Sequence, residues 1–104
     1  MPSFRLQVMS LKRVLFNDDV LSIYLCGDEG EYELLAFHYP LMGTLVEGEI
    51  KIAGHASLGI RSGVIMFDNN KCTILVEELD PNKPGGTLWK EIESLASLDK
   101  GRSS

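Results

Sequence analysis

The chain has 104 residues, of which 44% are hydrophobic and 24% are charged, and its formal net charge is −5. This size suits one compact domain with its own core. The 15 acidic residues outnumber the 10 basic ones, which form no cluster, so we expect no nucleic-acid partner. No apolar run approaches the ~20 residues of a membrane-spanning helix, and no signal peptide follows Met1, so we expect no direct membrane insertion.

Alternating apolar residues predict a strand at the start of the chain. Phe4, Leu6 and Val8 alternate with polar neighbours, which is the period of a half-buried strand. A second short strand is expected at residues 14–16, closed by turn residues at 17–19. Residues 20–26 form the clearest predicted strand, because they are rich in β-branched and aromatic side chains.

Turn residues divide the rest of the first 80 residues into further short strands. A polar loop is expected over 27–31, followed by apolar runs over 34–37 and 41–46 that Pro40 separates. Further turns are expected at 47–49, at 54–55 and at 62–63, and residues 68–71 give a strong hairpin signal before the last strand, 72–79. Strands punctuated roughly every eight to twelve residues predict an all-β fold. We therefore expect an antiparallel β-sandwich or flattened barrel of about eight to ten short strands over residues 1–80.

The chain changes character after residue 80. Two prolines and two glycines over residues 81–86 cannot continue a strand, and they predict a linker. Thr87 is a suitable N-cap, and four apolar residues follow it at helical spacing. We expect one short amphipathic α-helix over residues 87–98, about 18 Å long, and a frayed tail over residues 99–104.

The cysteines and histidines have no spacing that indicates a metal site or a catalytic pair. Cys26 and Cys72 each lie in an apolar run without C-x-x-C spacing, so we expect reduced, buried thiols. A disulfide would require the fold to bring them together. His55 lies in a turn and is expected to be an ordinary solvated side chain, and His38 has no second ligand at metal spacing.

Four carboxylates fall within residues 28–33. They do not follow the register of an EF-hand loop, and consecutive exposed acids are usually just solvated. Residues 84–87 open the predicted helix but lack the Gly-Lys-Ser/Thr sequence that holds phosphate. We therefore expect no catalytic site, no metal and no cofactor.

A series of short motifs occurs in a fixed order along residues 4–79. Gly27-Asp28-Glu29-Gly30-Glu31 is close to Gly-x-Glu-Gly-Glu, and His38-Tyr39-Pro40-Leu41-Met42 is close to His-Ala-Pro-Leu-Leu. The segments Phe4–Ser10, Leu45–Ile50 and Asn70–Leu75 accompany them in matching order. This succession resembles the epsilon subunit of bacterial F-type (rotary) ATP synthases, with the N-terminal β-sandwich domain and a shortened C-terminal tail.

The chain departs from that family pattern in two places. Phe37 and Tyr39 stand where the family commonly has Gly and Ala, so the bend before His38 is expected to be bulkier. The family's usual C-terminal hairpin of two long helices is reduced to residues 87–98, and its ATP-binding motif is missing. The resemblance therefore implies little or no self-inhibition by the tail and no nucleotide site.

The resemblance also implies a function without catalysis in the chain itself. The subunit would dock on the gamma subunit and the c-ring of a proton- or sodium-translocating ATP synthase, as a monomer within the hetero-oligomeric complex. It would couple rotation to ATP synthesis on the cytoplasmic side, peripheral to the membrane. The matching motifs imply partner-contact residues near the ring-facing end of the subunit, namely Glu29, Gly30, Glu31, Tyr32, His38, Leu41 and Met42. Core packing is the alternative role for Leu41 and Met42.

Two other classes of protein stay open on the residues alone. A stand-alone small β-barrel that binds a ligand or peptide predicts a concave apolar pocket with a few convergent polar groups. An enzyme that uses the carboxylates at 29–33 predicts raised carboxylate pKa values in a cleft. The rotor interpretation instead predicts a filled core and flat, partly apolar patches on the exterior.

Overall fold

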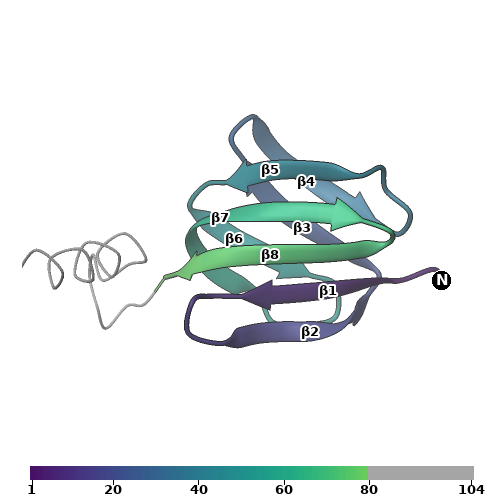
Figure 1. The fold of residues 1–104 in the computed structure, drawn as a ribbon, viewed down its shortest axis with the longest axis horizontal. Coiled ribbons are helices and arrows are strands. Elements are labelled where there is room, and N and C mark those ends of the chain that lie inside the picture. Colours follow the sequence, from purple (N-terminus) through teal and green to yellow (C-terminus); the bar gives the residue numbers. More distant parts are fainter. Residues whose placement is uncertain (80–104) are drawn as a thin grey trace, which may run out of the picture.

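The computed structural model describes residues 1–79, which form eight β-strands and no helix (Figure 1). The prediction of an all-β fold is therefore confirmed for these residues. The predicted linker at 81–86, the helix at 87–98 and the tail at 99–104 lie outside the described residues. The strands are β1 (Phe4–Met9), β2 (Val14–Val20), β3 (Ser22–Gly27), β4 (Gly30–Leu35), β5 (Leu41–Leu45), β6 (Gly48–Ile52), β7 (Leu58–Asp68) and β8 (Lys71–Glu78).

The strands form one hydrogen-bonded sheet that folds over into two layers. The order is β2-β1-β8-β7-β5-β3-β4, and β6 pairs with both β3 and β7. In Figure 1 the strands β5, β7, β8, β1 and β2 form a front layer, and β4, β3 and β6 lie behind it. All the pairs are antiparallel except β1 with β8, which run parallel.

The core fills the space between the two layers, and all eight strands contribute to it. Phe4 and Phe67 are almost completely buried, and their rings meet edge to face with centroids 5.4 Å apart. Alternate residues of each strand point inward, as the period of two requires. The buried apolar residues are Phe4, Leu6, Val8, Val20, Ile23, Leu25, Leu34, Leu45, Ile50, Ile52, Ile60, Ile65, Phe67, Cys72, Ile74 and Val76.

The strand β7 connects the two layers. Its residues 63–67 pair with β5 in the front layer, whereas residues 58–60 pair with β6 in the back layer. The register with β8 shifts between Ile60 and Ser62, which marks a β-bulge. The predicted turn at residues 62–63 is therefore wrong, because a bulge bends a strand without ending its pairing.

Two further strand boundaries differ from the sequence prediction. Residues 17–19 do not form a turn, because they continue β2 and pair with β1; Asp18 lies opposite Leu6. Polar residues are tolerated there because β2 is at the edge of the sheet. The predicted strand at 20–26 is interrupted by a bend at Leu21, where the chain leaves β2 and enters β3.

The two tight turns have backbone conformations that their residues favour. The β7–β8 hairpin is confirmed, and both Asn69 (φ 51°) and Asn70 (φ 59°) adopt the left-handed conformation of its two-residue loop. The predicted polar loop at 27–31 is shorter than expected, because Gly27 already pairs with Gly30. Gly30 has φ 123°, a backbone conformation that residues other than glycine rarely adopt.

An ion pair fastens the β1–β2 turn to the end of β8. Arg13 donates from Nη2 to Glu78 Oε1 at 2.7 Å and from Nε to Oε2 at 3.4 Å. The hydrogen bond from Arg13 lowers the pKa of Glu78, because the guanidinium favours the ionised carboxylate.

Glu78→Gln is expected to reduce the free energy of unfolding at neutral pH. Because the pKa of Glu78 is lower in the folded chain, its ionised carboxylate contributes its full stabilisation at pH values above the pKa in the unfolded chain, about 4.3. This stabilisation is lost as the pH falls through the lower folded value. Urea unfolding of both chains between neutral and acid pH should therefore show a difference that disappears at acid pH. A difference independent of pH would contradict this account.

Candidate docking faces

The outer faces of the two layers differ in chemistry. The front layer carries two rows of directly opposed, outward-facing residues across β5, β7, β8 and β1. Residues opposite one another in such pairs share a face of the sheet. The first row is Met42, Met66, Thr73 and Gln7, and the second is Thr44, Val64, Leu75 and Met9.

Apolar side chains dominate these two rows. Met42 is 80% exposed, Val64 51% and Met66 47%, while Met9 and Leu75 are half-buried beside them. We refer to these five residues as the apolar band. The sequence contains a signal for this band, because residues 64–67 are four consecutive apolar residues. Successive side chains of a strand point to opposite faces, so two of these four must face outward. Of the five residues of the band, only Met42 is among the contact residues predicted from the sequence.

Charged residues border the apolar band at one end. The next row across the front layer consists of Asp68, Lys71, Arg5 and Asp19, each opposite its neighbour. Arg5 Nε lies 3.1 Å from Asp19 Oδ1. The apolar band is thus bounded rather than continuous with the whole front face, as expected of a protein contact surface with a polar rim.

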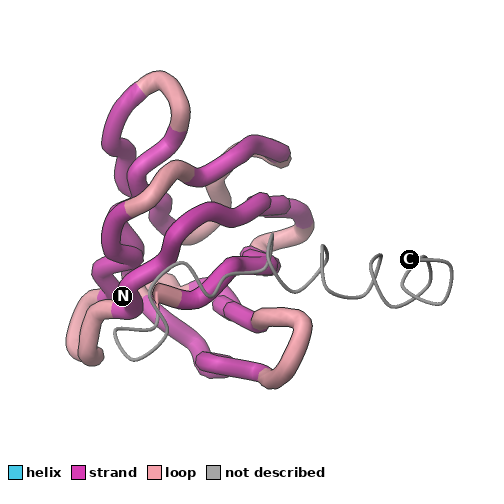
Figure 2. The backbone as a smooth tube through the Cα atoms, turned by 90° about the vertical axis from the view of Figure 1, so that its left-hand side faces the viewer, coloured by secondary structure: helices cyan, strands magenta, loops and turns pink. Residues whose placement is uncertain are grey.

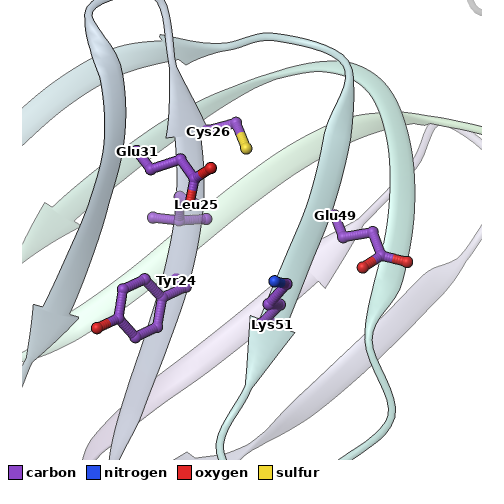
Figure 3. Close-up of a pocket in the computed structure, with 6 residues that line it drawn as sticks. All are labelled: Tyr24, Leu25, Cys26, Glu31, Glu49 and Lys51. Carbon is purple, nitrogen blue, oxygen red and sulfur yellow. The ribbon is translucent and has the colours of Figure 1, made fainter.

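The outer face of the back layer is predominantly charged. Glu31 and Glu33 on β4 face outward, as do Tyr24 on β3 and Lys51 on β6. The strands β3 and β6 pair only at Ile23–Ile52 and Tyr24–Lys51, and beyond these pairs they separate. A hollow of about 180 Å³ lies there (Figure 3), lined by Tyr24, Leu25, Cys26, Glu31, Glu49 and Lys51.

The four predicted contact residues of the β3–β4 hairpin do not share one environment. The turn between these strands lies at the top of Figures 1 and 2, where Glu29 and Gly30 are exposed. Glu31 points into the hollow of the back face (Figure 3). Tyr32 is half-buried and packs against the core, and burial is the main cause that raises its pKa. Its main contact is therefore with the core.

The other predicted residues lie in or after the loop that joins β4 to β5. His38 is exposed, and its ring lies edge-on to Phe67 with centroids 5.8 Å apart. Met42 faces outward in the apolar band, whereas Leu41 is opposite Phe67 and packs against the core. The alternative role of core packing therefore applies to Leu41 but not to Met42.

The hairpin turn and His38 are separated by the length of β4. Six residues of strand span roughly 20 Å at about 3.3 Å per residue. The turn and the β4–β5 loop accordingly lie toward opposite ends of the sandwich (Figure 1). The predicted contact residues are therefore divided between two regions of the surface.

The asparagine of the β7–β8 turn fixes the β4–β5 loop. Asn70 Oδ1 accepts the backbone N–H of Phe37 at 2.7 Å, and its Nδ2 donates to the carbonyl of Ser3 at 2.9 Å. Phe37 has φ 65°, a conformation that is unusual for a bulky residue. One amide side chain therefore connects the start of the chain, the β4–β5 loop and the β7–β8 turn.

The two cysteines and His55 differ in burial and in their contacts. Cys26 and Cys72 are both free; Cys72 is buried as predicted, whereas Cys26 is only half-buried. Burial raises the pKa of the Cys72 thiol to about 12, which keeps it protonated and unreactive. His55 is exposed but not simply solvated, because its ring meets Phe16 edge-on at 5.0 Å.

Residues 1–79 contain no group of three or more His, Cys, Asp or Glu side chains placed to hold a metal ion. Within that range no helix has the length and apolar character needed to cross a membrane.

The fold defines a two-layer β-sandwich with one partly apolar and one charged outer face. Residues 3–81 match the family described as "ATP synthase, Delta/Epsilon chain, beta-sandwich domain". The chain belongs to this family. The resemblance stated from the sequence motifs is therefore confirmed.

Curated relatives and solved structures agree with this assignment. The ATP synthase epsilon chain of Protochlamydia amoebophila is 30% identical over 93% of this chain and 73% of its own. The chloroplastic epsilon chain of Anthoceros angustus and the epsilon chain of Sulfurimonas denitrificans are each 35% identical, over 75% and 74% of this chain. The chain spans only 59% and 62% of the length of these two relatives.

The fold is also found in solved rotary assemblies. A chain in the central stalk and c-ring structure of the Tetrahymena thermophila mitochondrial ATP synthase superposes with a TM-score of 0.64. It covers 94% of this chain and 90% of its own, at 15% identity. A chain of the Euglena gracilis mitochondrial ATP synthase gives a TM-score of 0.62 over 73% of this chain and 52% of its own, at 20% identity. At these identities the likeness concerns the fold.

Proposed function

We propose that this chain is the epsilon subunit of the central stalk of an F-type ATP synthase. In this role it performs no chemistry; it docks on the gamma subunit and on the c-ring and couples rotation to ATP synthesis. Its family and the names of its relatives support the proposal. It would function as one copy in the hetero-oligomeric complex, on the cytoplasmic side and peripheral to the membrane.

The apolar band is the observation that carries this proposal. Met42, Val64 and Met66 are exposed side by side on a flat sheet face of a small acidic domain. A contiguous exposed apolar patch with a polar rim is typical of a protein contact surface. We therefore assign the front face, which we propose forms the larger part of the interface, to the gamma subunit.

The charged back face supports a second, different contact. Glu31, Glu49 and Lys51 all line the hollow of the back face, and Glu29 is exposed at the hairpin turn. Carboxylates of this kind give specificity and orientation when they face complementary charges on a partner. We assign this hairpin to the c-ring, with Glu29 and Glu31 as the polar contacts.

The filled core does not favour the alternative of a ligand-binding barrel. Large side chains from both layers, such as Phe4, Phe67 and Ile74, are almost completely buried between the sheets. A ligand site would instead need a concave apolar cavity with convergent polar groups. Docking through the front face and the β3–β4 hairpin is therefore better supported than binding of a ligand inside a barrel. The expectation of weak self-inhibition concerns residues 81–104 and stays a prediction.

Met66→Lys is expected to weaken binding to the gamma subunit from the same cells by about tenfold or more, because it places a charge in the centre of an apolar contact. Tyr24→Lys is the matched control: Tyr24 is 46% exposed and Met66 47%, but Tyr24 lies on the back layer. Titration of purified gamma subunit with each full-length chain measures both affinities.

The outcomes of this titration separate the assignments. Loss of affinity in Met66→Lys with unchanged affinity in Tyr24→Lys supports gamma docking through the front face. Equal affinities of all three chains would move the contact away from the apolar band. A wild-type chain that binds neither gamma subunit nor c-ring would contradict the proposed function.

A further inference from the structure

Two large aromatic side chains project from the β4–β5 loop. Phe37 is 73% exposed and Tyr39 is 82% exposed, although apolar rings of this size are usually at least partly covered. The loop is short and joins β4 in the back layer to β5 in the front layer, two strands that do not pair with one another. The packing of the sandwich itself therefore does not account for these two rings.

The loop is held rigidly from both sides. The Asn70 amide accepts the Phe37 N–H at 2.7 Å, and the His38 ring rests edge-on against the buried Phe67. Within the loop, His38 Nδ1 lies 2.7 Å from the Tyr39 carbonyl oxygen, and the rings of His38 and Tyr39 meet at 6.0 Å. A backbone that is fixed before binding loses little freedom when a partner binds, so exposed rings on such a loop are suited to be anchors.

The backbone of Phe37 adds a second, independent observation. Its φ of 65° is strained for any residue with a bulky side chain, and glycine would adopt it without strain. The hydrogen bond to Asn70 holds this backbone conformation, but it does not require a large side chain, because glycine could donate the same N–H. A strained residue with its ring in solvent indicates a role outside the folding of the chain itself.

The aromatic loop continues into the face assigned to the gamma subunit. Tyr39 is followed by Pro40, Leu41 and Met42, and Met42 belongs to the apolar band. A hollow of about 360 Å³ at this junction is lined by Pro40, Leu41, Met42, Met66, Phe67 and Asp68. The aromatic loop therefore adjoins the apolar band through Pro40 and this hollow.

We propose that Phe37 and Tyr39 are specificity-determining anchors that insert into apolar recesses of the cognate gamma subunit and restrict this chain to it. This inference rests on the proposed function and deepens it. With small residues at positions 37 and 39, the loop would fit a flat partner surface. This chain instead carries two large aromatic side chains there. A gamma subunit that lacks matching recesses is excluded because the rigid rings hold the two surfaces apart.

The test compares two gamma subunits and three full-length chains. The gamma subunits are the one from the same cells and one from an organism whose epsilon chain has Gly and Ala at these positions. The chains are the wild type, the double variant Phe37→Gly/Tyr39→Ala, and Tyr24→Ala, which truncates an exposed aromatic residue on the other layer. Dissociation constants and thermal unfolding midpoints are measured for each.

We expect the double variant to bind the cognate gamma subunit about tenfold or more weakly and the other gamma subunit more tightly than the wild type does. Its unfolding midpoint should not fall, because Phe37→Gly removes strain. Tyr24→Ala should match the wild type in affinity for both gamma subunits. This pattern assigns the loss to contacts and not to misfolding.

Other results overturn the inference in distinguishable ways. If the double variant binds both gamma subunits as the wild type does, the inference is wrong, while sensitivity to Met66→Lys keeps the proposed function. If its midpoint falls together with its affinity, the rings are structural and the inference is wrong. If the wild type binds no gamma subunit, both the inference and the proposed function fail.

Discussion

Asn70→Ala is expected to reduce the free energy of unfolding by about 2 to 3 kcal/mol. The Asn70 amide accepts from the Phe37 N–H and donates to the Ser3 carbonyl, and alanine can do neither. Asn70 also adopts φ 59°, which asparagine tolerates better than alanine. The substitution therefore removes two hydrogen bonds and strains the turn.

The neighbouring asparagine separates these two effects. Asn69 has φ 51° in the same turn and an exposed side chain, so Asn69→Ala changes mainly the backbone preference. Asn70→Gly keeps the left-handed conformation but removes the amide. Urea unfolding should rank Asn70→Ala as the most destabilising and Asn69→Ala as the least. Equal losses for the two alanine variants would show that the Asn70 bridge contributes nothing.

Gly63→Ala is expected to destabilise the sandwich by about 2 to 3 kcal/mol, at the upper end of overpacking effects. A Cβ atom at this position would lie 2.9 Å from the carbonyl oxygen of Leu75 and 3.3 Å from Val76 Cγ1. The oxygen belongs to the backbone of β8, which β7 and β1 hold on both sides, so it cannot move away easily. The strands must separate where β7 bends between the layers.

Gly43→Ala in the adjacent β5 is the matched control. Its Cβ atom would have Ile65 Cγ2 at 3.8 Å as its only close neighbour, which is an ordinary contact. Because alanine restricts the unfolded chain more than glycine does, this variant should be neutral or slightly stabilising. Thermal and urea unfolding of both variants check the pair. Similar stability of Gly63→Ala and Gly43→Ala would contradict the close approach at Gly63.

The period of two made most of the fold predictable from the sequence. The alternation at residues 4–8 and the Asn69-Asn70 turn correctly indicated β1 and the β7–β8 hairpin. The errors arose where tertiary pairing overrides local preference. Polar residues 17–19 continue as a strand because β1 supplies their hydrogen-bond partners, and residues 62–63 continue β7 as a bulge because β8 pairs along it.

The candidate site was less predictable because it depends on neighbours that are distant in sequence. Met42 and Met66 share a row only through the β5–β7 pairing, and Val64 meets Leu75 only through the β7–β8 pairing. Motif matching selected consecutive residues, so it grouped the hairpin turn with His38 although β4 separates them. The backbone position of Phe37 is held by Asn70, which lies 33 residues further along the chain, and no local pattern reveals this contact.

The parallel pairing of β1 with β8 has a consequence for how the chain folds. One edge of β1, at residues 5–9, pairs only with residues 71–75, so the front layer closes after nearly all of the described chain has been synthesised. Contacts of such long sequence separation slow folding, because the entropy of closing the loop is lost before the contacts form. Until then the β1–β2 hairpin has an unpaired edge and exposed apolar residues, which makes the nascent chain prone to aggregation. This chain should therefore depend more on chaperones during synthesis than a domain built from local hairpins alone.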